Sequence, residues 1–196
     1  MGRWEPNARG RLQKAAFELF AERGFEQATV AEIADRAGLT ERTFFRYFAD
    51  KREVLFAGAA ALQDLMVSAV AGAPESAAPI DAIAAALDAA GAMFDEHGTG
   101  ARRRQAIITA HADLRERELI KLASLAAALA DALRRRGVGE PAASLSAEAG
   151  IAVFKIAFER WIGAPDGPGL TRVTRASLDE LKAVAAGGAL VDRFTG

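Results

Sequence analysis

The residues best suited to chemistry lie between Thr40 and Lys51, in the stretch TERTFFRYFADK. An arginine can pair with guanine through two hydrogen bonds, and hydroxyl or ammonium groups suit phosphate oxygens. Arg42, Arg46 and Tyr47 supply such groups within one short segment. Their types and spacing predict a surface that reads nucleic acid.

A helical arrangement decides which of these side chains face outward. Phe44 and Phe48 are four residues apart and share one helix face, which we expect to point inward. The alternative is that Phe45 and Tyr47 are also core, with the arginines on a solvated face. Four aromatics within five residues cannot all point inward from one short helix, so we favour the reading surface. The residues left on the outward and flanking faces are Glu41, Arg42, Thr43, Phe45, Arg46 and Tyr47.

The elements around this segment have clear helix-start signals. Thr29 is followed three residues later by Glu32, and Asp50 by Glu53, as in capping boxes, while Thr40 is a simple cap. The residues Ala-Gly-Leu at 37–39 predict a tight corner. Two short helices joined by such a corner form a helix-turn-helix, which places its second helix in the DNA major groove.

Helical periodicity continues through the rest of the chain. A helix is expected from Asn7 to Arg23, ended by Gly24, and another from Lys51 towards Val70. No stretch has sustained β-alternation, so the fold class is all-α, with about nine helices. The residues at 71–74 predict a break between an N-terminal head and a larger body. Further helices are expected near 79–96, 101–111, 113–136, 144–162 and 170–186.

Composition limits the possible classes of protein. Hydrophobic residues make up 51% of the chain, which excludes a disordered protein, and the absence of cysteine excludes disulfides and thiol catalysis. The N-terminus has no apolar segment typical of a signal peptide. Charges are expected to interrupt the apolar runs before the ~18 residues of a membrane span. We therefore expect a cytoplasmic protein without a membrane partner.

Net charge gives little support to nucleic-acid binding. The whole chain carries −1, and residues 1–55 hold ten Lys/Arg against nine Asp/Glu, a net +1. Any DNA binding must therefore depend on where individual charges lie.

Enzymatic motifs are not evident in the sequence. His97 and His111 are the only histidines, and neither lies in a metal-binding motif such as H-E-x-x-H. The sequence has no nucleophile elbow, P-loop or dinucleotide fingerprint. We expect no catalytic residue, no metal and no cofactor.

Residues from about 9 to 55 resemble the DNA-binding head of the tetracycline-repressor (TetR) family. The matching patterns are A-A-x-x-L-F-A-E-R-G-F from Ala15, T-V-A-E-I-A from Thr29, A-G-L-T from Ala37 and T-F-F-R-Y-F-x-x-K from Thr43. The resemblance implies a homodimer that places two heads in successive major grooves of a pseudo-palindromic operator. Many members have glycine near Arg42 and histidine at the position of Tyr47, so the operator sequence stays open.

The resemblance also implies roles for individual side chains. Thr29 and Thr40 would touch the DNA backbone at helix starts. Base contacts are implied for Arg42, Thr43 and Phe45, and phosphate contacts for Arg46, Tyr47 and Lys51.

The segment 144–162 is apolar almost all round, which indicates burial on more than one side. Its partners are either the monomer core or a second subunit, and we expect a mixture of both. In family terms this helix and that near 170–186 would form a four-helix dimer interface.

Residues 102–138, with VFKIAFERW behind them, resemble the C-terminal domain of the TetR subgroup associated with acyl-CoA-like effectors. The resemblance implies an apolar tunnel for a long acyl chain. Arg102, Arg103 and Arg104 could bind a nucleotide phosphate or form a solvated helix start. Ordinary core packing is the alternative for every candidate lining residue. The candidates are Leu65, Met66, Phe94, Ile107, Ile108, His111, Leu122, Leu125, Phe154, Phe158 and Trp161.

These patterns predict a helix-turn-helix DNA-binding domain over 1–55 and a ligand-binding and dimerisation domain over 56–196. The function expected is that of a ligand-responsive transcriptional regulator, a repressor released from DNA by a hydrophobic effector. The rivals are a soluble hydrophobic-ligand binding protein that lacks specific DNA recognition, and an enzyme on an all-α scaffold.

Overall fold

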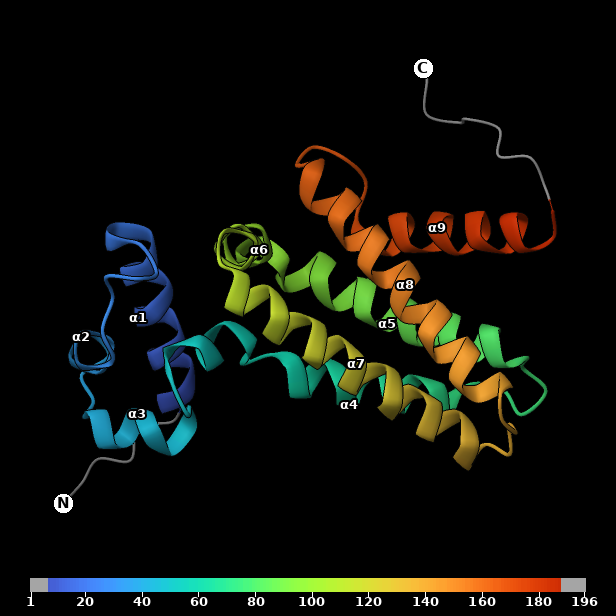
Figure 1. The fold of residues 1–196 in the computed structure, drawn as a ribbon, viewed down its shortest axis with the longest axis horizontal. Helices are drawn as coiled ribbons and strands as arrows, with labels where there is room; N and C mark the ends of the chain where they lie inside the picture. The colour runs from blue at the N-terminus through green and yellow to red at the C-terminus, as the bar shows by residue number, and fades with distance from the viewer. Residues whose placement is uncertain (1–6, 188–196) are drawn as a thin grey trace. The chain divides into compact units, whose positions relative to one another are not determined.

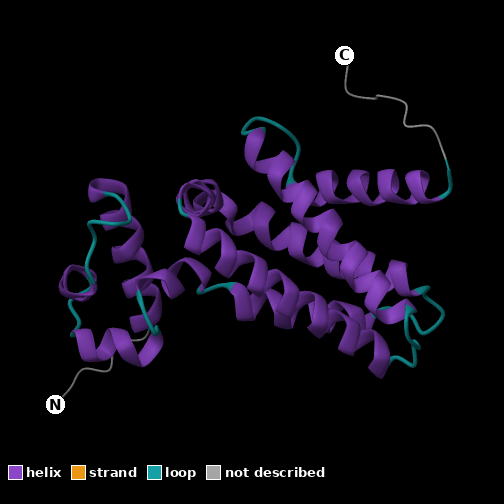
Figure 2. Cartoon of the chain, viewed as in Figure 1, coloured by secondary structure: helices purple, strands orange, loops and turns teal. Residues whose placement is uncertain are grey.

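The computed structural model describes residues 7–187, apart from the side chains of His97 and Thr99. Every regular element in this range is a helix, nine α-helices and two short 3-10 helices (Figures 1 and 2), which confirms the all-α prediction. The chain divides into two compact units, one up to Ala59 and the other from Ala60 onwards. We call them the head and the body.

The head contains three α-helices and a 3-10 helix, and each begins within two residues of its predicted start. Their bounds are α1 (Ala8–Arg23), α2 (Val30–Arg36), α3 (Glu41–Tyr47) and η1 (Lys51–Phe56).

Side-chain caps explain where the short helices begin. Thr29 Oγ1 accepts the Glu32 amide at 3.2 Å while the Glu32 carboxylate accepts the Thr29 amide at 3.0 Å, which is a complete capping box. Thr40 Oγ1 accepts the Thr43 amide at 3.2 Å. The Asp50 carboxylate accepts the second and third amides of η1 at 2.8 and 3.1 Å. These bonds satisfy amides that a helix start leaves without partners.

The core of the head draws on all four elements. Leu12 and Leu19 of α1, Ile33 of α2, Phe44 of α3 and Val54 of η1 are each at most 2% exposed. Burial of one such side chain stabilises the fold by roughly 1.5–3 kcal/mol. The three helices are therefore held as one unit, although α2 and α3 are too short to be stable alone.

The corner between α2 and α3 depends on Gly38. Its φ of +64° lies in the left-handed region, which costs a glycine almost nothing. The Gly38 amide donates to Asp35 O at 2.8 Å and the Leu39 amide to Ala34 O at 2.9 Å, so the chain turns sharply and α3 starts two residues later.

The single helix predicted from Lys51 towards Val70 is wrong. A turn at Ala57 and Gly58 separates η1 from α4 (Ala59–Gly72). Glycine inside a helix costs about 1 kcal/mol relative to alanine, which favours the break there. Phe56 of η1 is buried in the head, whereas Met66 belongs to the body core.

The expectation that charges interrupt the apolar runs holds for this segment, since Glu53, Asp64 and Glu75 leave no uncharged run longer than ten residues. By length and composition alone, Lys51–Gly72 passes as a membrane span, with a mean hydropathy of 1.7 and 28% of the window buried. The same 22 residues form two helices of different type on either side of the turn. A spanning helix needs about 20 continuous residues, so we assign no membrane role to this stretch.

The body is built around α8. One face of this helix is buried, including Ile151, Phe154 and Phe158, and the helix contacts α5, α7 and α9. The opposite face remains exposed in the single chain, with Ile156 51% exposed, so the predicted burial of this segment on more than one side stays a prediction. The helices of the body after α4 are α5 (Pro79–His97), η2 (Gly98–Gly100), α6 (Ala101–Ala110), α7 (Ala112–Arg135), α8 (Ala142–Gly163) and α9 (Leu170–Ala185).

Two residues of α5 bring it against the start of α9. A Cβ on Gly91 would lie 2.6 Å from Thr171 Cα, so only glycine permits this backbone approach. One turn later, the Asp95 carboxylate accepts the amides of Leu170 at 2.6 Å and Thr171 at 3.2 Å. Asp95 therefore caps α9 from a helix 75 residues earlier in the chain.

Candidate nucleic-acid interface

Helix α3 divides its aromatic residues between core and surface as predicted. Phe44 and Phe48 are 0% and 4% exposed, while Phe45 and Tyr47 are 55% and 40% exposed. The alternative in which Phe45 and Tyr47 are core is therefore wrong. The Phe45 ring stands edge-on to Phe44, with 5.5 Å between ring centres, so a buried aromatic supports an exposed one.

The polar residues of α3 lie on the same exposed side. Arg42 and Arg46 are exposed, and the Arg46 guanidinium lies 5.0 Å from the centre of the Tyr47 ring. Its Nη2 also donates to Tyr47 Oη at 3.3 Å. Thr43 is half-buried, with its hydroxyl 3.1 Å from that of Thr40. The surface thus offers guanidinium groups, hydroxyls and a bare ring edge to an approaching ligand.

Thr29 caps the start of helix α2 and forms a capping box there. Its hydroxyl donates to Glu32 Oε2 at 2.9 Å, and Glu32 in turn forms an ion pair with Arg23. The pKa of Glu32 is lowered chiefly by the hydrogen bond from the Thr29 amide, then by the hydroxyl of that residue and by Arg23. The start of α2 is therefore a fixed group of hydrogen bonds at an exposed site.

Lys51, for which the family resemblance implies a phosphate contact, has backbone partners within the head. Its Nζ donates to the carbonyl oxygens of Phe25 at 2.8 Å, Glu26 at 2.9 Å and Ala28 at 3.1 Å. It also lies 4.8 Å from the centre of the Phe25 ring. The ammonium thus points at the loop between α1 and α2, a contact that no local sequence signal indicates.

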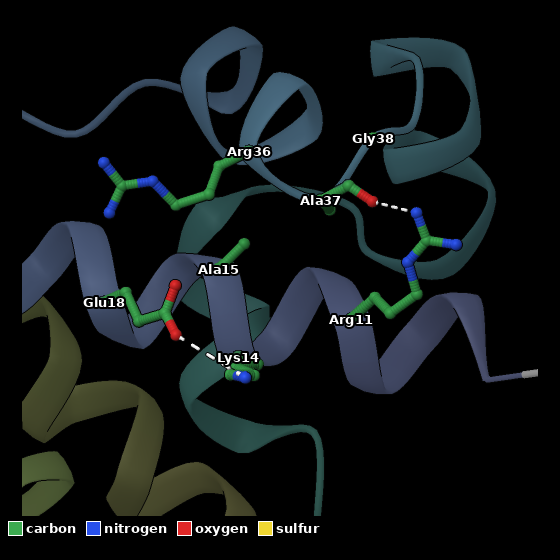
Figure 3. A pocket seen from close by; sticks show the side chains of 7 residues that line it. All are labelled: Arg11, Lys14, Ala15, Glu18, Arg36, Ala37 and Gly38. Carbon is green, nitrogen blue, oxygen red and sulfur yellow. Dashed lines mark hydrogen bonds and ion pairs between the residues drawn. The ribbon is translucent and has the colours of Figure 1, made fainter.

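Arginine side chains brace the corner of the helix-turn-helix (Figure 3). Arg11 of α1 donates from Nη2 to the carbonyl of Ala37, immediately before Gly38. Arg36 donates to Glu22 Oε1 at 2.6 Å, which lowers the pKa of Glu22. The residues around these contacts line an open hollow of about 360 Å³, and they are Arg11, Lys14, Ala15, Glu18, Arg36, Ala37 and Gly38.

The predicted ligand-lining residues meet only in part. Seven of them gather in the body core, where Phe94 packs against Phe154, Phe158 and Trp161 with ring centres 5.3–6.2 Å apart. Those seven are Met66, Phe94, Leu122, Leu125, Phe154, Phe158 and Trp161. Ile107, Ile108 and His111 lie on and just after α6 outside that cluster, and Leu65 is 36% exposed.

A small hollow in the body lies between α5 and α9. It measures about 40 Å³, and none of the predicted lining residues borders it. Pockets for small ligands usually measure 300–1,000 Å³. The rings of Phe94, Phe154, Phe158 and Trp161, which were expected to line a tunnel, pack on one another.

Two of the three consecutive arginines have structural partners. Arg102 lies 4.9 Å from the Trp161 ring centre and donates to the carbonyls of Trp161 at 3.2 Å and Ile162 at 3.4 Å. Arg104 pairs with Glu118 at 3.3 Å, and burial lowers its pKa. Arg103 is exposed. Arg102 therefore ties α6 to α8, and Arg104 ties α6 to α7.

Comparison with known proteins agrees with this geometry. Residues 12–57 match the family of bacterial regulatory proteins called tetR, and residues 77–186 match the MftR C-terminal domain. The transcriptional regulator TcmR of Streptomyces glaucescens is 36% identical over 81 residues, which are 41% of this chain. These residues span 36% of TcmR, so the chain matches about a third of that relative.

Solved structures share the fold along nearly the whole chain. FadR from Bacillus subtilis, in complex with stearoyl-CoA, superposes with a TM-score of 0.59 at 19% identity, over 88% of this chain and 96% of FadR. SmeT, the repressor of the Stenotrophomonas maltophilia efflux pump SmeDEF, gives 0.60 at 19% identity, over 90% and 89%. With a matched head and a C-terminal match over more than half of its length, the chain belongs to the TetR family of transcriptional regulators and has an MftR-type C-terminal domain.

Proposed function

We propose that this TetR-family regulator is a repressor that binds a pseudo-palindromic operator as a homodimer and is released by a hydrophobic effector. The observation that carries the proposal is the exposure of Phe45 and Tyr47 beside Arg42 and Arg46 on a helix locked by Phe44. Exposing two aromatics on a short helix is costly unless a partner covers them. As a family of transcription regulators accounts for the chain, it is not an enzyme.

On DNA, α3 would enter the major groove. We assign Arg42, Thr43 and Phe45 to base edges, since a guanidinium suits guanine and an apolar ring suits the thymine methyl group. Arg46 and Tyr47 would meet phosphates. Thr29 and Thr40 would present the capped starts of α2 and α3 to the backbone, where amide groups and positive dipole ends attract anions.

The homodimer would form through α8 and α9. Leu145 and Ile156 on α8 are 66% and 51% exposed, and Val184 on α9 is 53% exposed. Exposed branched residues on two adjacent helices suit a two-fold interface in which the same patch meets itself. Half-sites about one helical turn apart, roughly 34–36 Å, or a multiple of that spacing, would match two such heads.

The effector we propose is a long acyl chain, as in acyl-CoA. Support comes from the FadR likeness and from the apolar aromatic cluster in the body. Because that cluster is packed, an acyl chain must displace Phe94, Phe154 or Trp161 to enter. Entry would therefore favour a second conformation of the body, and a difference of ~1–3 kcal/mol between the two states gives a useful switch. The regulator would act in the cytoplasm, where the bacterial chromosome lies.

Selection of bound duplexes from a random DNA pool, with and without stearoyl-CoA, tests the proposal. A palindromic sequence should be enriched without stearoyl-CoA and lost with it. Enrichment unaffected by stearoyl-CoA would contradict only the proposal that the effector is a long acyl chain. If no sequence were enriched while stearoyl-CoA still bound, the protein would be a hydrophobic-ligand carrier. Reporter transcription that rose with the bound regulator would show activation instead of repression.

A further inference from the structure

Lys51 has a hydrogen-bond acceptor for each of its side-chain donors. A lysine ammonium has three N–H donors. The carbonyls of Phe25, Glu26 and Ala28 lie 2.8, 2.9 and 3.1 Å from Nζ, which matches that number. The Phe25 ring, 4.8 Å away, adds a cation–π contact. A phosphate could reach this ammonium only at the expense of these contacts.

The three carbonyls belong to the loop that leads into α2. Phe25 and Ala28 are 6% and 1% exposed, so their side chains anchor the loop in the core. Ala28 directly precedes Thr29, the cap of α2. The ammonium therefore fixes the backbone at the point where α2 and its capping box begin.

We propose that Lys51 is a positioning residue, which acts on DNA binding by holding the start of α2 and does not itself contact a phosphate. The inference rests on the proposed function, because it concerns how the head meets its operator. It reassigns a residue of the predicted phosphate set whose ammonium donates to backbone carbonyls of the head. Arg46 and Tyr47, which are exposed, keep that assignment.

Lysine labelling of the unaltered protein separates the two roles. The reagent acetylates accessible ammonium groups, and Lys14, whose side chain is 81% exposed, serves as the reference within the same chain. Lys51 should react at least tenfold more slowly than Lys14 in free protein, and operator duplex should leave its rate unchanged. Reaction as fast as that of Lys14, followed by protection on adding operator, would show a phosphate contact and overturn the proposal.

Salt dependence provides the second measurement. Each phosphate contact contributes about 0.9 to the slope of log K against log salt. Lys51→Met should weaken operator binding about tenfold at every salt concentration, with an unchanged slope. Lys51→Arg, which keeps the charge but replaces three divergent donors by a planar fork, should weaken it as well. Arg46→Met is the matched variant and should lower the slope by about 0.9.

A double-mutant cycle tests whether Lys51 acts through the start of α2. If it does, Lys51→Met should cost much less affinity in a Thr29→Val background than in wild type. Equal losses in both backgrounds, or a slope lowered by Lys51→Met, would contradict the positioning role. If the wild type selected no operator at all, the repressor proposal would fail. Slow labelling of Lys51 in free protein would still show that the carbonyls of the loop before α2 hold its ammonium.

Discussion

The polar side chains of the head have two different roles. Some are engaged in hydrogen bonds within the head, and others are exposed on α3. Thr29 and Lys51 have hydrogen-bond partners within the head. Arg42, by contrast, is exposed on α3 next to Phe45. Engaged groups hold the backbone in place, and exposed ones are available to read bases. Residue type alone does not separate the two sets.

Arg42→Ala should relax base preference. Loss of a bidentate contact with guanine is worth about 1–3 kcal/mol of discrimination, so affinity for the operator should fall towards that for random DNA. Competition titrations with an operator duplex and a random duplex measure the two affinities. Arg103→Ala, which removes an exposed arginine of the body, is the matched control. An equal loss on both duplexes would mean that Arg42 contacts a phosphate.

Glu32→Gln should change how stability depends on pH. The folded pKa of Glu32 lies below its unfolded value of about 4.3, so ionised Glu32 contributes stability above that pH and loses it as the pH falls through the folded pKa. The stability gap between wild type and variant should be constant above about pH 6 and close at acid pH. The midpoints of urea unfolding, measured across pH, test this dependence. Glu75→Gln, in an exposed loop, is the control. A gap that is independent of pH would contradict the role of the charge.

At the scale of elements, local signals locate most helix boundaries. The caps at Thr29, Thr40 and Asp50 and the corner at Gly38 lie within a few residues of the helices that they define. The start of α9 differs, because its N-cap position is a glycine and the capping carboxylate comes from Asp95 on α5. Only the packing of the two helices brings that carboxylate within reach.

Asp95→Ala should destabilise the body. Loss of a side-chain cap costs about 0.5–2 kcal/mol, and here the amides of Leu170 and Thr171 lose their acceptor together. Thermal unfolding should show a lower midpoint. Asp64→Ala, which changes an exposed carboxylate on α4, should leave the midpoint nearly unchanged. Equal midpoints for the two variants would mean that water replaces the cap at no cost.

At the scale of the whole molecule, the head and the body have different relations to possible partners. The head exposes a compact set of residues on α3, while the body buries its aromatics and exposes branched residues on α8 and α9. Assembly into a dimer and entry of an effector would therefore act on different surfaces of the body. Because these surfaces are separate, an effector would be able to change the conformation of the body without dissociating the dimer.

Ile156→Glu should convert the proposed dimer into a monomer. A carboxylate in an apolar interface leaves an unpaired buried charge, and two-fold symmetry introduces it twice. Sedimentation should report the mass of one chain, and operator binding should fall because the two heads are no longer linked. Leu119→Glu, at an equally exposed position on α7, is the matched control and should remain dimeric. A dimeric Ile156→Glu would place the interface elsewhere.

The sequence by itself determined the helices, the corner and the orientation of the aromatics on α3. These features depend on caps, periodicity and a glycine, all of which act over a few residues, and they suffice to predict the helix-turn-helix. The break before α4 was missed, because its position reflects two separate cores as well as Gly58.

Only the tertiary structure decided which polar groups are engaged and which apolar residues of the body pack together. Lys51 meets carbonyls 23–26 residues away, and Asp95 meets amides 75–76 residues away, so neither contact has a local signal. The same apolar spacing serves a packed core and a cavity equally well. Packing alone placed Phe94 against Phe154, Phe158 and Trp161, all of which were candidates to line an effector site.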